Sequence, residues 1–324
     1  MPRFTYPPAH TVDVVDDYHG TPVADPYRWL EEPDSPETQS FIAAQNTLTD
    51  EFLSEIPARE SVRKRLTELW NYARYTAPFR EGDHYYMFQN DGLQNQSVMY
   101  RTDDLNETPI KVLDPNTLSD DGTVALVGWN FSDDGERLAY VIARSGSDAQ
   151  EIRIMEVSTG EVYPETLEWG RFSGIAWLKD KSGFYYNRYP DPDTVAVEDQ
   201  QAYNRLYFHK VGTPQTEDKL IYERPDAKEL NFPPTITEDG QYVVLVIWHG
   251  AISRTRVYYR PIDNDGDFIR LIPDADAKYN FIGNTGSTFY LLTDKDAPRG
   301  RVVAIDVNHP DQWQTIIPET DDVI

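Results

Sequence analysis

The residues best suited to chemistry are serines beside glycines, because a Gly-x-Ser-x-Gly turn presents the nucleophile of many serine hydrolases. The segment Gly170-Arg171-Phe172-Ser173-Gly174 comes close to this pattern, but its serine stands one place too late. Ser145-Gly146-Ser147 lacks the first glycine, and no complete copy of the motif occurs in the 324 residues. A serine hydrolase also needs a histidine base and a carboxylate that orients it. We therefore assign no catalytic residue in this chain.

Histidine and acidic residues show no spacing typical of a metal site. The six histidines are isolated from one another in the sequence, and no His-Glu-x-x-His motif occurs. Asp191 and Asp193 resemble a calcium-binding turn only loosely, and we interpret them as part of a solvated loop. Phosphate-binding and dinucleotide-binding glycine motifs are also missing. The sequence predicts neither a metal nor a cofactor.

The charge balance argues against two classes of partner. Acidic residues number 55 and basic residues 30, which gives a net charge of −25. Nucleic-acid binding depends on Lys and Arg side chains that neutralise phosphates, and anionic membranes attract the same cations. We therefore expect neither partner. We interpret the excess of acidic residues as a solvated surface. The alternative is that their negative electrostatic potential attracts basic peptides.

The absence of cysteine excludes disulfides, thiolate metal ligands and cysteine nucleophiles. The first eight residues have no apolar core of the signal-peptide type. No apolar run approaches the roughly 18 residues that a membrane span needs. We expect a cytoplasmic protein.

The first 71 residues predict a largely helical arm. Residues 1–33 are rich in proline and aromatic side chains, which predicts an extended segment with a short helical turn near Tyr27–Glu31. Ser35-Pro36-Glu37 is a helix start, because serine caps, proline fits the first turn and glutamate complements the helix dipole. Apolar residues at spacings of three and four then predict a helix that ends before Pro57 and a second helix from Ala58 to Trp70.

From about residue 72 the apolar period changes to two, as expected for β-strands. Five short apolar runs each follow a tight turn that carries a glycine. These glycines are Gly82, Gly135, Gly183, Gly240 and Gly286. Their intervals of 46 to 57 residues predict a repeating unit of about four strands, which is typical of a β-propeller blade. The alternative is a β-sandwich or two separate all-β domains.

The predicted fold class is therefore mainly β, with a β-propeller of about five blades over residues 72–324 after the arm of residues 1–71. Five blades could close a ring by themselves. However, nothing near the C-terminus resembles a strand that closes the first blade. An incomplete propeller would expose a sheet face and strand edges, which proteins normally cover.

Several segments resemble the prolyl oligopeptidase family of serine peptidases. The opening Tyr18–Glu31, with the sequence YHGTPVADPYRWLE, is similar to that family's N-terminal signature. Three later segments, Ser145–Val157, Arg171–Trp177 and Leu206–Asp218, are similar to stretches of its propeller. The resemblance extends from residue 6 to about residue 318 and thus covers nearly the whole chain.

The resemblance implies both a fold and an activity. In this family a seven-bladed propeller is inserted between N-terminal helices and a C-terminal segment, which together form an α/β-hydrolase domain, and the propeller covers the active site. All three catalytic residues lie in the C-terminal segment. We expect this chain to hold the arm and about five blades, with two blades and the catalytic segment following Ile324. It would then gate short proline-containing peptides into a serine-type prolyl endopeptidase.

The resemblance also implies which residues contact the peptide. Phe172 stands where the family places an aromatic residue near the substrate, and the alternative is a core aromatic on a strand. Asn231 and Trp248 align with loops that approach the outer positions of the substrate. At these loops the sequence departs from the better-known family members.

Two other functions remain open. One is a stand-alone peptide- or protein-binding propeller without catalysis. The aromatic residues of the arm argue against it, because they need another domain to pack on. These residues are Tyr27, Trp29, Phe41 and Phe52. The other is a related oligopeptidase B or dipeptidyl peptidase, which fits the Asp25–Leu30 segment but fits the later blades less well.

We expect residues 1–324 alone not to hydrolyse a chromogenic Gly-Pro substrate, because the sequence supplies no activated serine. The measurement is release of the chromophore by the purified chain. Turnover that persists through purification and is blocked by a serine-directed inhibitor would contradict this assignment.

Overall fold

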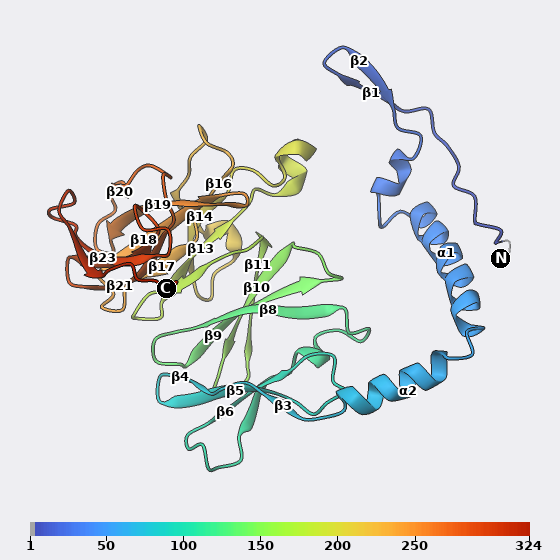
Figure 1. Ribbon diagram of the computed structural model, residues 1–324, viewed down its shortest axis with the longest axis horizontal. Helices are drawn as coiled ribbons and strands as arrows, with labels where there is room; N and C mark the ends of the chain where they lie inside the picture. Colours follow the sequence, from blue (N-terminus) through green and yellow to red (C-terminus); the bar gives the residue numbers. More distant parts are fainter. Residues whose placement is uncertain (1–3) are drawn as a thin grey trace. The chain divides into compact units, whose positions relative to one another are not determined.

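The computed structural model describes residues 4–324, so the first three residues of the expected arm lie outside the described part. The chain divides into two compact units, one reaching to Tyr72 and the other running from Ala73 to Ile324 (Figure 1). No helix in the described residues is both long and apolar enough to cross a membrane. We describe the two units separately.

The first unit holds the predicted helices. A short 3-10 turn, η1 (Arg28–Glu31), precedes α1 (Pro36–Ser54) and α2 (Arg59–Trp70). The side chain of Ser35 accepts a hydrogen bond from the backbone N–H of Thr38 at 3.2 Å, which confirms the predicted cap. The Trp29 and Phe41 rings meet edge to face, with centroids 5.7 Å apart. These two aromatics therefore pack on each other within the unit.

The prediction of an extended segment over residues 1–33 does not include the hairpin in its central part. Strands β1 (Val15–Tyr18) and β2 (Thr21–Ala24) form an antiparallel hairpin. Its two turn residues, His19 and Gly20, have φ values of 56° and 88°, as a tight hairpin turn requires. His-Gly is not one of the common hairpin turn pairs, so the sequence signal for this hairpin is weak.

The second unit consists of five antiparallel sheets that follow one another along residues 73–324, all of which the structure describes. The first sheet holds β3 (Arg74–Tyr75), β4 (Phe79–Glu81), β5 (His84–Asn90), β6 (Val98–Thr102) and β7 (Ile110–Leu113). The second holds β8 (Val124–Phe131), β9 (Arg137–Arg144), β10 (Gln150–Glu156) and β11 (Val162–Gly170). The third holds β12 (Ile175–Trp177), β13 (Gly183–Arg188), β14 (Arg205–Lys210) and β15 (Lys219–Tyr222).

The fourth sheet holds β16 (Leu230–Asn231), β17 (Pro234–Ile236), β18 (Tyr242–His249), β19 (Ile252–Pro261) and β20 (Ile269–Ile272). The fifth holds β21 (Tyr279–Thr285), β22 (Thr288–Thr293), β23 (Arg301–Asp306) and β24 (Trp313–Ile317). Short 3-10 turns are η2 (Pro115–Thr117), η3 (Pro192–Thr194), η4 (Val197–Asp199) and η5 (Gln215–Glu217). Each predicted repeat thus corresponds to one sheet, and the fourth strand that the sequence signals only weakly is present in every sheet.

Neighbouring sheets share apolar cores. On β9, Leu138, Tyr140 and Ile142 are buried against the first sheet, whereas Ala139 and Val141 are buried against the third. A strand sends successive side chains to opposite faces, so a middle strand that is apolar at every position serves two cores at once. Two further cores join the third sheet to the fourth and the fourth to the fifth.

The outer faces of the first and fifth sheets are less covered. On β22, Phe289 and Leu291 are fully buried toward the fourth sheet, while Tyr290 and Leu292 on the opposite face are half-buried. The same contrast occurs on β5, where Tyr86 is fully buried and Met87 is half-buried. The series of sheets therefore ends in apolar faces that it does not bury itself.

The predicted glycine turns are confirmed at four of five positions. Gly82, Gly135, Gly240 and Gly286 have positive φ values between 56° and 73°. At the third turn the left-handed residue is Lys181, with φ 52°, and Gly183 instead begins β13. A Cβ atom on Gly183 would lie 2.2 Å from the carbonyl oxygen of His209 and 2.6 Å from the Phe208 ring. This glycine is therefore required for close approach of two strands.

We expect Gly183→Ala to lower the free energy of unfolding of the 324-residue chain by about 1–3 kcal/mol, because the added methyl overpacks the β13–β14 contact. The matched control is Gly283→Ala, since Gly283 also lies in a strand and its added Cβ would meet nothing within 4 Å. Denaturant unfolding monitored by circular dichroism measures both variants. Equal effects of the two substitutions would contradict the steric explanation.

Candidate functional site

All three predicted peptide-contacting residues lie at the same end of the sheets. We call this the connection end, because there the chain passes from one sheet to the next. Phe172 lies in the connection from β11 to β12, Asn231 ends β16, and Trp248 is the last residue but one of β18. The glycine turns lie at the opposite end, which we call the turn end.

Phe172 is an exposed loop residue, so the alternative of a core aromatic on a strand is wrong. Its side chain is 56 % exposed, and its backbone has φ 50°. A phenylalanine rarely adopts this left-handed conformation, which costs about 1–2 kcal/mol. The Arg171 guanidinium lies over its ring at 5.7 Å from the centroid and pairs with Asp148 at 2.7 Å. The loop therefore presents an aromatic ring to solvent at an energetic cost.

Asn231 and Trp248 lie opposite each other on paired strands, so their side chains leave the same face of the fourth sheet. Asn231 is buried, and its amide oxygen accepts a hydrogen bond from the hydroxyl of Tyr189. Burial raises the pKa of the Tyr189 hydroxyl, which favours its role as a donor. Trp248 is half-buried. The structure thus brings Asn231 and Trp248 together, and Tyr189 connects them to the third sheet.

A hollow of about 180 Å³ lies beside these residues, between the second and third sheets. Its walls include Trp169, Arg171, Tyr189 and Pro190. The guanidinium of Arg188 lies 5.0 Å from the Trp169 ring centre and 4.0 Å from that of Tyr207, which fixes the Trp169 wall. An aromatic hollow with arginine and hydroxyl groups suits the apolar faces and carbonyl groups of a peptide.

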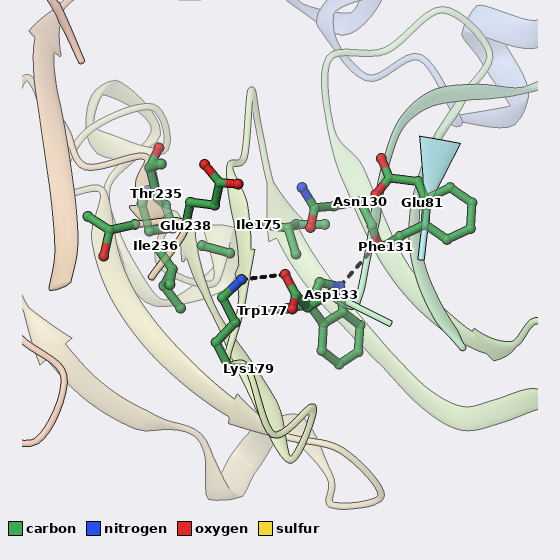
Figure 2. Close-up of a pocket in the computed structure, with 13 residues that line it drawn as sticks. Glu81, Asn130, Phe131, Asp133, Ile175, Trp177, Lys179, Thr235, Ile236 and Glu238 are labelled. Carbon is green, nitrogen blue, oxygen red and sulfur yellow. Dashed lines mark hydrogen bonds and ion pairs between the residues drawn. The ribbon is translucent and has the colours of Figure 1, made fainter. Parts of the chain in front are cut away.

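A second hollow, of about 310 Å³, lies at the turn end (Figure 2). Ile175 and Trp177 of β12 contribute apolar surface, and Lys179 points toward Asp133 and forms an ion pair with it. Burial, reinforced by the negative charge of Asp133, raises the pKa of the Glu81 carboxyl in the same wall. Sequence reasoning did not identify this hollow, because its lining residues come from four separate sheets.

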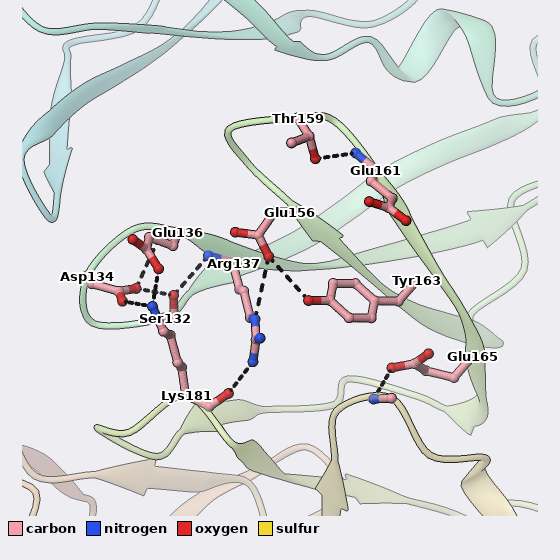
Figure 3. Close-up of polar contacts among 11 residues, drawn as sticks. Ser132, Asp134, Glu136, Arg137, Glu156, Thr159, Glu161, Tyr163, Glu165 and Lys181 are labelled. Carbon is pink, nitrogen blue, oxygen red and sulfur yellow. Dashed lines mark hydrogen bonds and ion pairs between the residues drawn. The ribbon is translucent and has the colours of Figure 1, made fainter.

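Polar contacts join the second and third sheets near the turn end (Figure 3). Lys181 forms ion pairs with Asp134, at 2.6 Å, and with Glu136. The guanidinium of Arg137 donates to the backbone carbonyl of Lys181 at 2.7 Å. Burial acts to raise the pKa of Asp134, but hydrogen bonds from Lys181 and Ser132 outweigh it and lower that pKa to about 2. Ionised Asp134 therefore contributes to the attachment of one sheet to the next.

His209 is the histidine most enclosed by carboxylates, a contact that its isolation in the sequence concealed. Its ring is fully buried, with Nδ1 2.7 Å from Asp218 and Nε2 3.7 Å from Glu165. The hydroxyl of Tyr186 donates to the other oxygen of Asp218 at 2.6 Å. Both ring nitrogens thus face carboxylates and not a serine. No group of three or more potential ligands in the described residues is arranged to hold a metal ion.

Comparison with known proteins identifies the family. Residues 7–324 match the family model described as the N-terminal β-propeller domain of prolyl oligopeptidase. The chain belongs to the prolyl oligopeptidase family. This confirms the resemblance that the opening and propeller segments indicate.

Relatives match the chain over nearly its whole length. A prolyl endopeptidase of Elizabethkingia meningoseptica is 37 % identical over 318 residues, which are 97 % of this chain and 45 % of that protein. Prolyl oligopeptidase A of Galerina marginata is 33 % identical over 98 % of this chain and 48 % of its own length. The chain therefore spans about half the length of the curated relatives it matches.

Solved structures of the family agree with the fold. One, from an analysis of two prolyl endopeptidases, has a TM-score of 0.85 and 31 % identity over 98 % of this chain and 47 % of that chain. Prolyl oligopeptidase B of Galerina marginata, bound to a 35mer hydrolysis and macrocyclization substrate, has a TM-score of 0.81 and 30 % identity. That match covers 98 % of this chain and 48 % of that one.

We expect Asp134→Asn to destabilise the chain more at pH 7 than at pH 2. The folded-state pKa of Asp134 is about 2, below the usual value of about 3.9. Its ionised form therefore stabilises the fold above about pH 4, and this contribution is lost as the pH falls through about 2. Denaturant unfolding of both proteins across this range measures the difference. Asp83→Asn, which removes a negative charge from a side chain that is 98 % exposed, is the control.

A difference between wild type and Asp134→Asn that stays constant from pH 7 to pH 2 would contradict this role of the Lys181–Asp134 contact.

Proposed function

We propose that this chain is the peptide-admitting part of a serine-type prolyl endopeptidase. In this proposal the catalytic α/β-hydrolase domain belongs to the half of the family's length that the chain does not match. The observation that carries the proposal is near-complete coverage of this chain by relatives named prolyl endopeptidase, combined with coverage of only 45 % of the relative. The sequence adds that no serine stands in a nucleophile turn.

The five sheets would be the first five blades of a seven-bladed propeller. Their sequential order and their pairwise shared cores suit such a ring. The half-buried faces at Tyr290 and Met87 would then be covered by two further blades. Residues 1–71 would pack on the hydrolase domain through the apolar residues of α1 and α2. Val62 and Leu66 of α2, about half exposed within their own unit, support this.

The peptide would bind at the connection end. Phe172 would contact an apolar side chain or a proline ring, while Asn231 and Trp248 would line an outer position of the substrate. The exposure and the unfavourable backbone conformation of Phe172 support this role, since strain of this kind concentrates at functional sites. A propeller over the active site would admit short proline-containing peptides and exclude folded proteins.

We expect Phe172→Ala, in the protein that includes the catalytic segment, to raise KM for a longer proline-containing peptide by about tenfold to a hundredfold, since removing an aromatic contact loses about 1.5–3 kcal/mol of burial. The value of kcat should change little, because the ring would bind substrate and transition state equally. Steady-state kinetics with a fluorogenic peptide measure both constants.

Trp313→Ala is the matched control, because Trp313 is a partly exposed aromatic at the turn end of the fifth sheet. It should leave KM unchanged. The same KM for wild type and Phe172→Ala would contradict the assignment of Phe172 to the peptide site.

A further inference from the structure

We propose that Asn187 and Asn204, two buried amides, are positioning residues that hold Phe172 and Asn231 in the arrangement that the peptide meets. This inference rests on the proposed function, since it takes Phe172 and Asn231 to be peptide contacts. Neither amide is accessible to a peptide, because Asn187 is 0 % exposed and Asn204 is 2 % exposed. They would act on the substrate only through other residues.

The Phe172 loop needs such support. Trp169 and Phe172 both have left-handed backbones, with φ 63° and 50°, so two unfavourable residues bracket Gly170 and Arg171. The Phe172 ring is more than half exposed and gains little from burial that would offset this cost. Strained backbone persists only where surrounding contacts determine it. Those contacts must come from the residues that flank Phe172.

Asn187 supplies the contacts on the C-terminal side of the loop. Its side-chain oxygen accepts a hydrogen bond from the backbone N–H of Gly174 at 2.8 Å. Its backbone carbonyl accepts from the Ser173 hydroxyl at 2.6 Å, and that hydroxyl accepts from the backbone N–H of Arg171 at 3.2 Å. Hydrogen bonds thus connect both sides of Phe172 to Asn187: Gly174 directly, and Arg171 through the Ser173 hydroxyl.

Asn204 continues the connection to the fourth sheet. Its side-chain oxygen accepts two hydrogen bonds, from the Asn187 amide at 3.2 Å and from the backbone N–H of Phe232 at 3.1 Å. Phe232 directly follows Asn231 in the chain. The Asn204 amide nitrogen is buried without a hydrogen-bond partner in the described residues. Burying an unpaired amide N–H costs free energy, so the nitrogen does not stabilise Asn204 in this position. The two hydrogen bonds that its oxygen accepts do.

A second contact runs in parallel. Tyr189, two residues after Asn187, donates its hydroxyl hydrogen to the side chain of Asn231. Asn231 is therefore fixed at its side chain by Tyr189 and at the adjacent backbone by Asn204. Phe172 and Asn231 lie 59 residues apart in the sequence, and the Asn187–Asn204 pair connects their loops through a chain of hydrogen bonds. This network favours one arrangement of the two segments, because moving either would leave the backbone N–H of Gly174 or Phe232 without its acceptor.

The test compares Asn204→Ala with Phe172→Ala and with the double variant, in the protein that includes the catalytic segment. Two substrates are used: a longer proline-containing peptide that reaches the outer positions, and a short Gly-Pro chromogenic substrate that does not. We expect Asn204→Ala to raise KM for the longer peptide about tenfold, with kcat unchanged and the short substrate unaffected. The double variant should raise KM by less than the product of the two single effects, because Asn204→Ala acts partly through the Phe172 contact that Phe172→Ala removes.

Hydrogen exchange gives a readout that does not depend on catalysis. In Asn204→Ala, the amides of Phe232 and Gly174 should exchange about tenfold faster, while amides of the fifth sheet keep their rates. Asn116→Ala is the matched control. It also removes an amide that bridges backbone groups, here those of Gln96, but it lies in the first repeat. It should change neither the kinetics nor the two exchange rates.

The outcomes separate the two claims. If Phe172→Ala leaves the longer peptide unaffected, the proposed peptide site is wrong, and the exchange rates still decide whether the amides order the loops. If Phe172→Ala raises KM for the longer peptide but Asn204→Ala does not, or if Asn204→Ala raises KM for both substrates equally, the positioning role is wrong.

Should Asn204→Ala not fold, Asn187→Asp takes its place. That variant keeps an acceptor for Gly174, removes the donor to Asn204 and sets a carboxylate oxygen against the Asn204 oxygen, so the Phe232 amide should become less protected than that of Gly174. The opposite order would overturn the proposal.

Discussion

The structure of residues 73–324 depends on middle strands that are buried on both faces. Each inner sheet contributes to two apolar cores, one shared with the preceding sheet and one with the following sheet. β9 shows this directly, since Leu138 and Ala139 enter different cores. Sheets that share cores in chain order must lie in chain order, so this single constraint fixes the succession of the sheets. The connections between them lie at one end because the chain crosses each sheet four times in antiparallel fashion. It also leaves the outermost faces only partly covered, because a series has two ends.

This arrangement separates two environments. The turn end carries charged side chains such as Lys181 and Asp134, whose ion pairs attach neighbouring sheets to each other. The connection end carries the exposed ring of Phe172, the Trp169 wall and the buried amides. At the connection end, the exposed ring of Phe172, its left-handed backbone and the buried amides belong to one connected set of contacts. For this reason we place peptide recognition there and regard the turn end as chiefly structural.

Much of the fold was predictable from local chemistry. Proline and serine before α1, the period of two after residue 72 and four of the glycine turns each rely on interactions among near neighbours in the chain. The failures have equally physical causes. Lys181 takes the left-handed position that Gly183 was expected to take, because Gly183 is needed where β13 and β14 approach closely. The β1–β2 hairpin has an uncommon turn pair, His19 and Gly20, so the sequence does not indicate a turn there. The many prolines of the arm instead predict a single extended segment.

The candidate site was predictable only in part, and through family resemblance rather than residue pattern. Phe172, Asn231 and Trp248 follow from aligned segments, but Asn187, Tyr189 and Asn204 do not. The sequence alone does not distinguish a fully buried asparagine from one in an exposed loop. The hydrogen-bond partners of these asparagines lie 13 to 28 residues away in the chain. Such contacts follow from the packing of whole sheets, which no short sequence window contains.

The most direct test of this account is a crystal structure of the chain with a proline-containing peptide bound. The account predicts electron density for the peptide at the connection end, against the Phe172 ring and beside Trp248. Peptide density in the turn-end hollow between Glu81 and Lys179, with the connection end empty, would contradict it.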